Sequence, residues 1–455
     1  MRTSSRIFQN IVTLFLIFYS SQNYFAQEKL NSVEHAEWTK NASIYEVNIR
    51  QYTPEGTFKA FAEHLPKIKE MGISIIWFMP IHPIGEINRK GSLGSYYSIQ
   101  DYKKVNPEFG TADDFKEVVD QIHDMGMYVI IDWVANHTAW DHPWTESNPE
   151  FYNKDENGNF IPPVADWYDV IDLDYDNKDL WIEMIDALKF WVDEYDIDGY
   201  RCDVAAMVPI EFWEQVRTEL DEIKPVFMLA EAHEPYLHSA FDMTYGWQLK
   251  DLMNDIAKGK KNAADIMKFV EAEKEEYPAD AYRMLFSTNH DENTWNGTVF
   301  ERLGDAAEVC AVLFSTLDGM PLVYSGQEAG MNKRLDFFEK DLIEWKDHKF
   351  YGLFQKIFDL KKNNKALWNG ESGGDINVLS GESDESIFAF YREKENDRVI
   401  VALNFSDEKQ NVIVKNNYIK GAYLDLFTDE KYTFTGKDNL TLDPLSYKVF
   451  FTNYN

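Results

Sequence analysis

The chain has 455 residues, of which 44% are hydrophobic and 27% are charged, so it has the composition of a globular protein with one large domain and one or two smaller ones. Its 45 basic and 78 acidic residues give a formal net charge of −33. This charge excludes nucleic acid and anionic membrane surfaces as partners and suits an uncharged substrate, although acidic charge also serves simply to keep a protein in solution.

The N-terminus has the order of a secretory signal. Arg2 and Arg6 precede an apolar run at 11–19, which a polar stretch and Ala26 follow. The run is shorter than the roughly 20 residues that a membrane-spanning helix needs. We therefore expect residues 1–26 to be a signal peptide and the protein to be exported to the periplasm or the medium, without stable membrane insertion. An uncleaved N-terminal anchor is the alternative.

Short apolar runs alternate with helical patterns over residues 37–365. The runs predict strands at 43–49, 73–78, 128–133, 199–204, 226–231, 241–245, 284–289 and 320–325. Apolar periodicity and capping signals predict helices at 58–71, 111–126, 177–195, 209–223, 304–317 and 347–363. Eight strands that alternate with helices predict parallel pairing and an α/β fold closed as a (β/α)₈ TIM barrel.

Two parts of the chain depart from the barrel pattern. Residues 139–176, after the third predicted strand, are too long for a simple connection and are rich in Trp, Pro, Asp and Asn. We expect them to form a small inserted domain at the C-terminal rim of the barrel. In residues 366–455 alternating strands are separated by turns of Gly, Asp and Asn, which predicts a C-terminal antiparallel β-sandwich.

The chain contains two cysteines, Cys202 and Cys310. An exported protein could join them in a disulfide. Their spacing fits neither a disulfide-rich scaffold nor a metal site, so we expect two buried free thiols.

Acidic residues lie at the ends of the predicted strands, where barrel enzymes place their active sites. Asp132 ends the third strand, Asp203 the fourth and Glu231 the fifth, and Asp291 follows the seventh. Arg201 lies two residues before Asp203, so both side chains should point into the barrel. A single acidic residue would more often be a cap or a surface group, but several at one rim indicate a catalytic site.

Such carboxyl groups suit glycoside cleavage with retention of configuration. That reaction uses a nucleophile and a proton donor about 5–5.5 Å apart. Arg201 beside Asp203 is expected to hold that carboxylate ionised, whereas Glu231 needs a raised pKa to arrive protonated. A third carboxylate could stabilise positive charge that develops on the sugar ring.

Four segments resemble the signature regions of the α-amylase family of glycoside hydrolases. They are DWVANH at 132–137, GYRCDV at 199–204, LAEA at 229–232 and STNHD at 287–291, in the order of the family. The resemblance implies an α-amylase-like retaining hydrolase that cleaves α-glucosidic bonds in starch-like α-glucans or maltooligosaccharides. An α-glucanotransferase that uses the same site is the alternative, and a non-catalytic glucan-binding relative is a more remote one.

The resemblance also implies a role for each residue of the site. Asp203 is implied to be the nucleophile, Glu231 the acid/base and Asp291 the stabiliser of the transition state. The implied substrate-site residues are Arg201, which orients the nucleophile, His137 and His290, which bind sugar hydroxyls, Tyr97, which stacks against the sugar, and Asp132, which is mainly structural. Tyr96 is the alternative to Tyr97 as the stacking residue.

The sequence departs from the family after the nucleophile. Many relatives carry Lys-His where this chain has Ala206 and Met207. Because that Lys serves the acceptor-side sugar and that His lends a carbonyl to a calcium ion, we expect altered acceptor binding. Asn136 and Asp174 match calcium ligands of the family, so a structural calcium ion is one interpretation; the other is that they brace the inserted domain. The chemistry itself is expected to need no cofactor.

Overall fold

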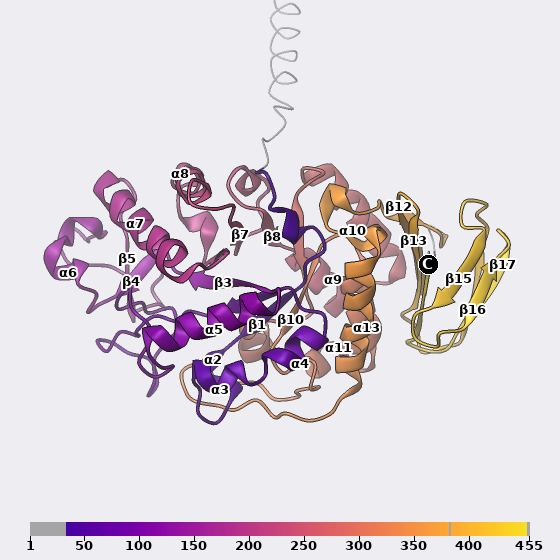
Figure 1. Cartoon of the computed structure of the whole chain (residues 1–455), viewed down its shortest axis with the longest axis horizontal. Coiled ribbons are helices and arrows are strands. Elements are labelled where there is room, and N and C mark those ends of the chain that lie inside the picture. Colours follow the sequence, from indigo (N-terminus) through magenta and orange to yellow (C-terminus); the bar gives the residue numbers. More distant parts are fainter. Residues whose placement is uncertain (1–32, 382–383, 453–455) are drawn as a thin grey trace, which may run out of the picture.

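The computed structural model describes residues 33–381 and 384–452. Eight parallel strands in these residues form a closed barrel (Figure 1). The order around the barrel is β1-β10-β9-β8-β7-β6-β3-β2. This confirms the predicted TIM barrel. The predicted signal peptide at 1–26 lies outside the described residues.

The barrel strands are buried on both faces, which is why they read as continuous apolar runs. They are β1 (Ile44–Val47), β2 (Ile75–Phe78), β3 (Tyr128–Trp133), β6 (Gly199–Cys202), β7 (Phe227–Ala230), β8 (Met243–Tyr245), β9 (Tyr282–Leu285) and β10 (Met320–Tyr324). Trp77, Phe227 and Tyr245 belong to the cluster that fills the barrel. The packing against the helices forms a separate and larger cluster.

Helices surround the barrel. The longer ones are α5 (Ala112–Asp124), α7 (Lys178–Tyr195), α8 (Ile210–Asp221), α9 (Trp247–Ala257), α10 (Ala263–Glu276), α12 (Ala307–Thr316) and α13 (Lys349–Asn363). The shorter ones are α2 (Ile49–Tyr52), α3 (Phe58–Ala62), α4 (Leu65–Glu70) and α11 (Val299–Leu303), whereas α6 (Trp144–Ser147) lies away from the barrel in the segment between β3 and α7. The capping box predicted for α5 is present, because Thr111 Oγ1 accepts from the Asp114 amide and Asp114 Oδ2 accepts from the Thr111 amide.

The structure corrects the predicted elements in three places. The helix predicted at 58–71 is divided into α3 and α4, because Pro66 has no N–H to continue the first helix and is tolerated in the first turn of α4, which begins at Leu65. The sequence analysis missed α9 and α10, although Asn262 and Asp265 form a capping box at the start of α10. The strand predicted at 284–289 is β9 (Tyr282–Leu285), so residues 286–289 lie past its end.

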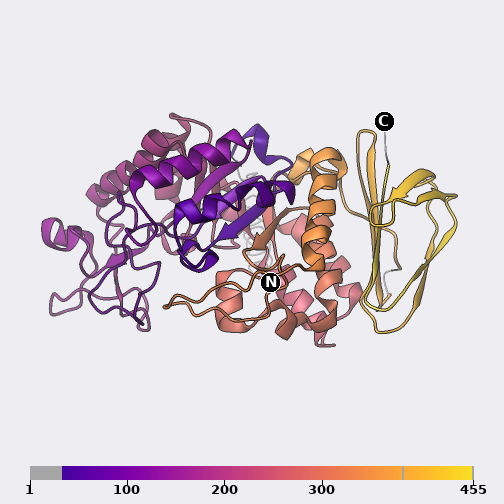
Figure 2. The same ribbon diagram turned by 60° about the horizontal axis from the view of Figure 1, so that its bottom comes forward.

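The segment between β3 and α7 leaves the barrel. It contains β4 (His137–Ala139) and β5 (Val170–Asp172), which pair antiparallel, and the short helix α6. In Figures 1 and 2 this segment lies at the end of the molecule opposite the C-terminal strands. It follows directly on β3, so it begins at the rim where the C-terminal ends of the barrel strands lie.

The C-terminal strands form an antiparallel β domain, as predicted. They are β11 (Asn377–Val378), β12 (Ile387–Lys394), β13 (Asp397–Asn404), β14 (Gln410–Val414), β15 (Gly421–Asp425), β16 (Lys431–Phe434), β17 (Asp438–Leu442) and β18 (Tyr447–Phe451). In the described part, β11, β12, β13, β18, β15 and β16 make one sheet, and β14 pairs with β17. Arg392 of β12 ties the domain to the barrel by donating to the carbonyls of Leu317 and Trp368 at 2.8 and 2.9 Å.

Both cysteines are free and buried, which confirms that prediction. Cys202 packs in the cluster between the barrel and the helices. None of the helices in the described part of the chain combines the length and the apolar character that crossing a membrane requires.

Candidate active site

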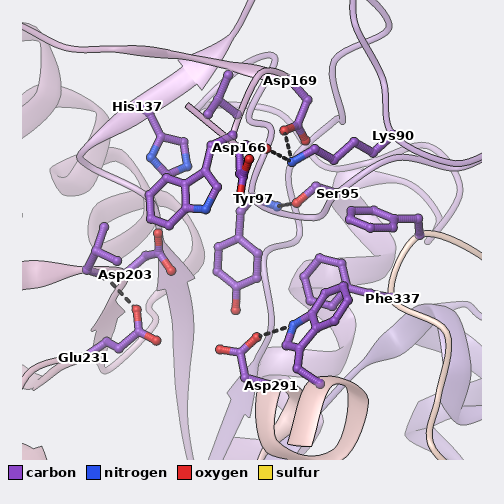
Figure 3. Close-up of a pocket in the computed structure, with 15 residues that line it drawn as sticks. Lys90, Ser95, Tyr97, His137, Asp166, Asp169, Asp203, Glu231, Asp291 and Phe337 are labelled. Carbon is purple, nitrogen blue, oxygen red and sulfur yellow. Dashed lines mark hydrogen bonds and ion pairs between the residues drawn. The ribbon is translucent and has the colours of Figure 1, made fainter. Parts of the chain in front are cut away.

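A pocket of about 560 Å³ lies at the C-terminal ends of the barrel strands (Figure 3). Asp203 follows β6, Glu231 follows β7 and Asp291 comes shortly after β9, and all three line the pocket. Tyr97 and His137 line it as well. The strand ends therefore bring together residues that are far apart in the sequence.

The guanidinium of Arg201 is the centre of the charged cluster. Its Nη1 donates to Asp132 Oδ1 at 2.8 Å and to Asp203 Oδ1 at 2.9 Å, and its Nη2 forms an ion pair with Glu231 Oε1 at 2.8 Å. The pairing of β3 with β6 places Asp132 beside Arg201. Because Arg201 is fully buried, one cation fixes the positions of three carboxyl groups.

Burial shifts the pKa values of these carboxyl groups upward. Burial, opposed by Arg201, raises the pKa of Asp203 to about 6 and that of Glu231 to about 8. The same balance raises the pKa of Asp132 to about 6. The pKa of Asp203 thus lies above its ordinary value although Arg201 lowers it, because burial and the neighbouring carboxylates outweigh one cation; the group is still ionised at neutral pH. The order of the two pKa values suits a nucleophile and a proton donor, because Asp203 loses its proton at a lower pH than Glu231.

Val204 has an unusual backbone next to this cluster. Its φ is +38°, a left-handed conformation that β-branched residues rarely adopt. This conformation accompanies a 2.8 Å hydrogen bond from the Val204 amide to Glu231 Oε2. Strain of this kind, about 1–3 kcal/mol, persists only where the surroundings enforce it, and here it helps to fix the Glu231 carboxyl group.

Tyr97 connects two parts of the site through its hydroxyl. The hydroxyl donates to Asp132 Oδ2 at 3.0 Å and lies 2.8 Å from His290 Nε2. The other ring nitrogen of His290 contacts Glu46. Tyr96, by contrast, is buried, and its hydroxyl accepts a hydrogen bond from Asn48 Nδ2 at 3.1 Å. Of the two tyrosines, Tyr97 is the one that lines the pocket.

The two histidines differ in charge. Burial lowers the pKa of His137 to about 3, so His137 is neutral. Burial also disfavours charge on His290, but Asp291 and Glu46 outweigh it and raise its pKa to about 9. His290 is therefore a cation that lies 3.3 Å from Asp291 Oδ2, and Trp295 donates its indole N–H to Asp291 Oδ1 at 3.2 Å.

Two family models match this sequence. The model described as "Alpha amylase, catalytic domain" matches residues 23–168 and 164–411. The chain belongs to the α-amylase family. The model described as "Maltogenic Amylase, C-terminal domain" matches residues 377–449.

Solved and curated relatives agree with this family. A noncanonic maltogenic alpha-amylase from Thermotoga neapolitana has a TM-score of 0.84 and 30% identity, over 92% of this chain and 100% of that one. Alpha-amylase 3 of Dictyoglomus thermophilum is 25% identical over 90% of this chain and 93% of its own length. Alpha-amylase MalA of Haloarcula japonica is 28% identical over 82% of this chain, which spans 57% of the length of that protein.

Several residues of this α-amylase site were not predicted from the sequence. Glu46 carries a signal that could have been used, because it is an acidic residue within an apolar strand and must face the barrel interior. Lys90 and Phe337 line the pocket from loops, and Trp295 lines it from the short π-helix Glu292–Asn296. Loop residues such as these follow no periodicity, so their positions could not be predicted from the sequence.

The two calcium candidates have protein partners. Asn136 Nδ2 lies 3.2 Å from His137 Nδ1, and Asp174 Oδ1 accepts from the Asp176 amide at 3.0 Å. Residues 33–381 and 384–452 contain no group of three or more His, Cys, Asp or Glu side chains that could hold a metal ion. Both side-chain contacts are with near neighbours in the chain, whereas the Leu173 amide donates to the Asn136 carbonyl at 3.1 Å and joins the two ends of the inserted segment. A structural calcium ion stays a prediction, and no step of the chemistry depends on it.

Proposed function

We propose that this α-amylase family glycoside hydrolase cleaves α-glucosidic bonds in starch-like α-glucans or maltooligosaccharides with retention of configuration. The observation that carries this proposal is the pair Asp203 and Glu231, which Arg201 holds together and whose pKa values lie in the order that the reaction needs. Asp203 is the nucleophile, Glu231 the acid/base and Asp291 the stabiliser of positive charge on the sugar.

The reaction then proceeds in two displacements. The Asp203 carboxylate attacks the anomeric carbon, and Glu231 donates its proton to the leaving oxygen. Water next attacks the same carbon, Glu231 takes its proton, and Asp203 leaves as a carboxylate. No cofactor takes part in these steps.

Transfer to a sugar acceptor is the second candidate function. It uses the same residues and differs only in whether water or a sugar hydroxyl resolves the intermediate. The observation that favours it is Ala206, an exposed residue at the position where many relatives carry the lysine that serves the acceptor-side sugar. Products longer than the substrate, measured by sizing during digestion of a maltooligosaccharide, would establish transfer.

We also propose that the protein is exported. The basic residues, the apolar run and the polar stretch at 1–26 support this proposal. Mass determination of the N-terminus of the secreted protein tests it.

The first product should carry the α configuration. Two displacements at one carbon restore the starting configuration, whereas a single displacement by water would invert it. Proton NMR during the first minutes of maltooligosaccharide hydrolysis measures the anomer directly. Early accumulation of the β-anomer would contradict Asp203 as the nucleophile.

The pH dependence of kcat/KM should be bell-shaped. Below about pH 6, Asp203 gains a proton and loses its nucleophilicity; above about pH 8, Glu231 loses the proton that it must donate. Because the two groups interact, the two limbs belong to the cluster and not to single residues. Initial rates on a maltooligosaccharide from pH 4 to 10 test this, and activity that keeps rising at high pH would contradict the assignment of the acid.

A further inference from the structure

At one edge of the active-site pocket a lysine from the loop after β2 bridges to the inserted segment. Lys90 Nζ donates to the carbonyl of Asp166 at 2.7 Å and forms an ion pair with Asp169 Oδ1 at 2.8 Å. Its ammonium also lies 4.7 Å from the centre of the Tyr168 ring. Lys90, Asp166 and Asp169 all line the pocket (Figure 3). The contacts join the loop after β2 to the inserted segment just before β5.

Further hydrogen bonds fasten the segments at this edge of the pocket. Ser98 Oγ donates to the carbonyl of Asp169 at 3.1 Å, and the Glu86 amide donates to Asp141 Oδ2 at 2.9 Å. The Leu93 amide donates to the carbonyl of Phe338 at 3.1 Å. The side chain of Lys90 is 18% exposed and that of Asp169 is 5% exposed, so their ion pair is largely shielded from solvent. The loop after β2, the inserted segment and the chain at Phe338 are thus joined at this edge of the pocket, and together they are called the wall below.

The chemistry fixes which end of the substrate meets this wall. Glu231 protonates the oxygen that leaves with the acceptor sugars, so those sugars lie past Glu231. The sugar that Asp203 attacks lies against Tyr97, and the sugars on its non-reducing side continue away from Glu231. In Figure 3 Tyr97 is drawn between Glu231 and Lys90. The wall therefore stands at the non-reducing end of the bound glucan.

We propose that the Lys90–Asp169 bridge makes the enzyme act from the non-reducing ends of α-glucans and release a short product of fixed length. The inference rests on the proposed function and adds its mode of attack. A pocket of about 560 Å³ lies within the range of about 300–1,000 Å³ of small-ligand sites, which suits a short oligosaccharide end and not a chain that runs through. An ammonium group has three donors, two of which are engaged by Asp166 and Asp169, so Lys90 can also donate to a terminal sugar hydroxyl.

The test compares two nitrophenyl maltoheptaosides, one free and one with an ethylidene bridge on its non-reducing end. The wild-type enzyme should cleave the free substrate and cleave the blocked one slowly, because the wall has no room for the bridge. Lys90→Ala should raise the ratio of blocked to free cleavage by about tenfold or more, the scale on which pocket contacts discriminate. Asp169→Asn should raise it in the same direction, and Lys90→Arg should stay near the wild type.

Lys154→Ala is the matched control, since Lys154 is an exposed lysine of the same inserted segment and does not line the pocket. Thermal melting of each variant shows that it is folded. Equal cleavage of both substrates by the wild type would overturn the inference while leaving the proposed function intact. An unchanged ratio in folded Lys90→Ala and Asp169→Asn would overturn it too. A wild type inactive on both substrates would overturn the proposed function and this inference with it.

Discussion

Replacing Asp203 with Asn is expected to reduce turnover by a factor on the order of 10³ to 10⁶, because an amide cannot form the covalent glycosyl intermediate. Arg201 keeps its contacts with Asp132 and Glu231, so the rest of the site should hold its geometry. The measurement is kcat on a maltooligosaccharide for wild type and variant. A folded Asp203→Asn enzyme with near-normal activity would falsify the assignment.

The Asp203→Asn variant should be at least as stable as the wild type at alkaline pH. Folding raises the pKa of Asp203 from 3.8 to about 6, so above pH 6 its negative charge opposes folding, and a neutral Asn removes that cost. Melting temperatures at pH 8 report this directly. Asp186→Asn on the surface of α7 is the matched control, because its side chain is 65% exposed and its ion pair with Lys103 contributes little. Loss of activity with unchanged or raised stability separates a chemical role from a structural one.

The strand ends were the part of this molecule that the sequence predicted best. A closed parallel barrel places every strand end at one rim, so Asp132, Asp203 and Glu231 had to converge once the strands were recognised. The alternation of side chains along β6 also predicted that Arg201 and Asp203 share the inner face. Both inferences depend on local pattern and on topology, which the sequence carries directly.

The protonation order of the site could not be predicted in the same way. The pKa values of Asp203 and Glu231 depend on how deeply each is buried and on how one guanidinium is shared among three carboxyl groups. The backbone strain at Val204 likewise arises from the packing around it, since nothing in the local sequence favours a positive φ for valine. These quantities depend on tertiary packing.

Contacts between loops were beyond sequence analysis for a different reason. Lys90 and Asp169 belong to irregular segments far apart in the chain, and neither segment has a periodicity that would orient its side chains. The length and composition of the inserted segment predict it, but nothing in the sequence pairs it with the loop after β2. The mode of attack on the glucan depends on that pairing, whereas the chemistry depends on the strand ends.

Glu231→Gln should lower activity on natural glucans by about 10² to 10⁴, the usual contribution of general acid catalysis. A glutamine amide cannot give a proton to the leaving oxygen, although it can keep the hydrogen bond from the Val204 amide. An aryl glycoside with a good leaving group needs no such proton, so formation of the intermediate from it should be affected much less by Glu231→Gln. In this variant the pH profile of that step should also lose its alkaline limb. Glu211→Gln, an exposed acidic residue in the first turn of α8, is the control.

Single-turnover measurements on the two substrates decide this prediction, because they separate formation of the intermediate from its hydrolysis. The pKa of Glu231 at about 8 is what lets one carboxyl group act first as an acid and then as a base near neutral pH, and the glutamine variant removes both actions at once. The intermediate should therefore form on the aryl substrate and accumulate, since no base remains to activate the water. Equal losses on both substrates, without accumulation, would show that Glu231 holds the site together and does not transfer the proton.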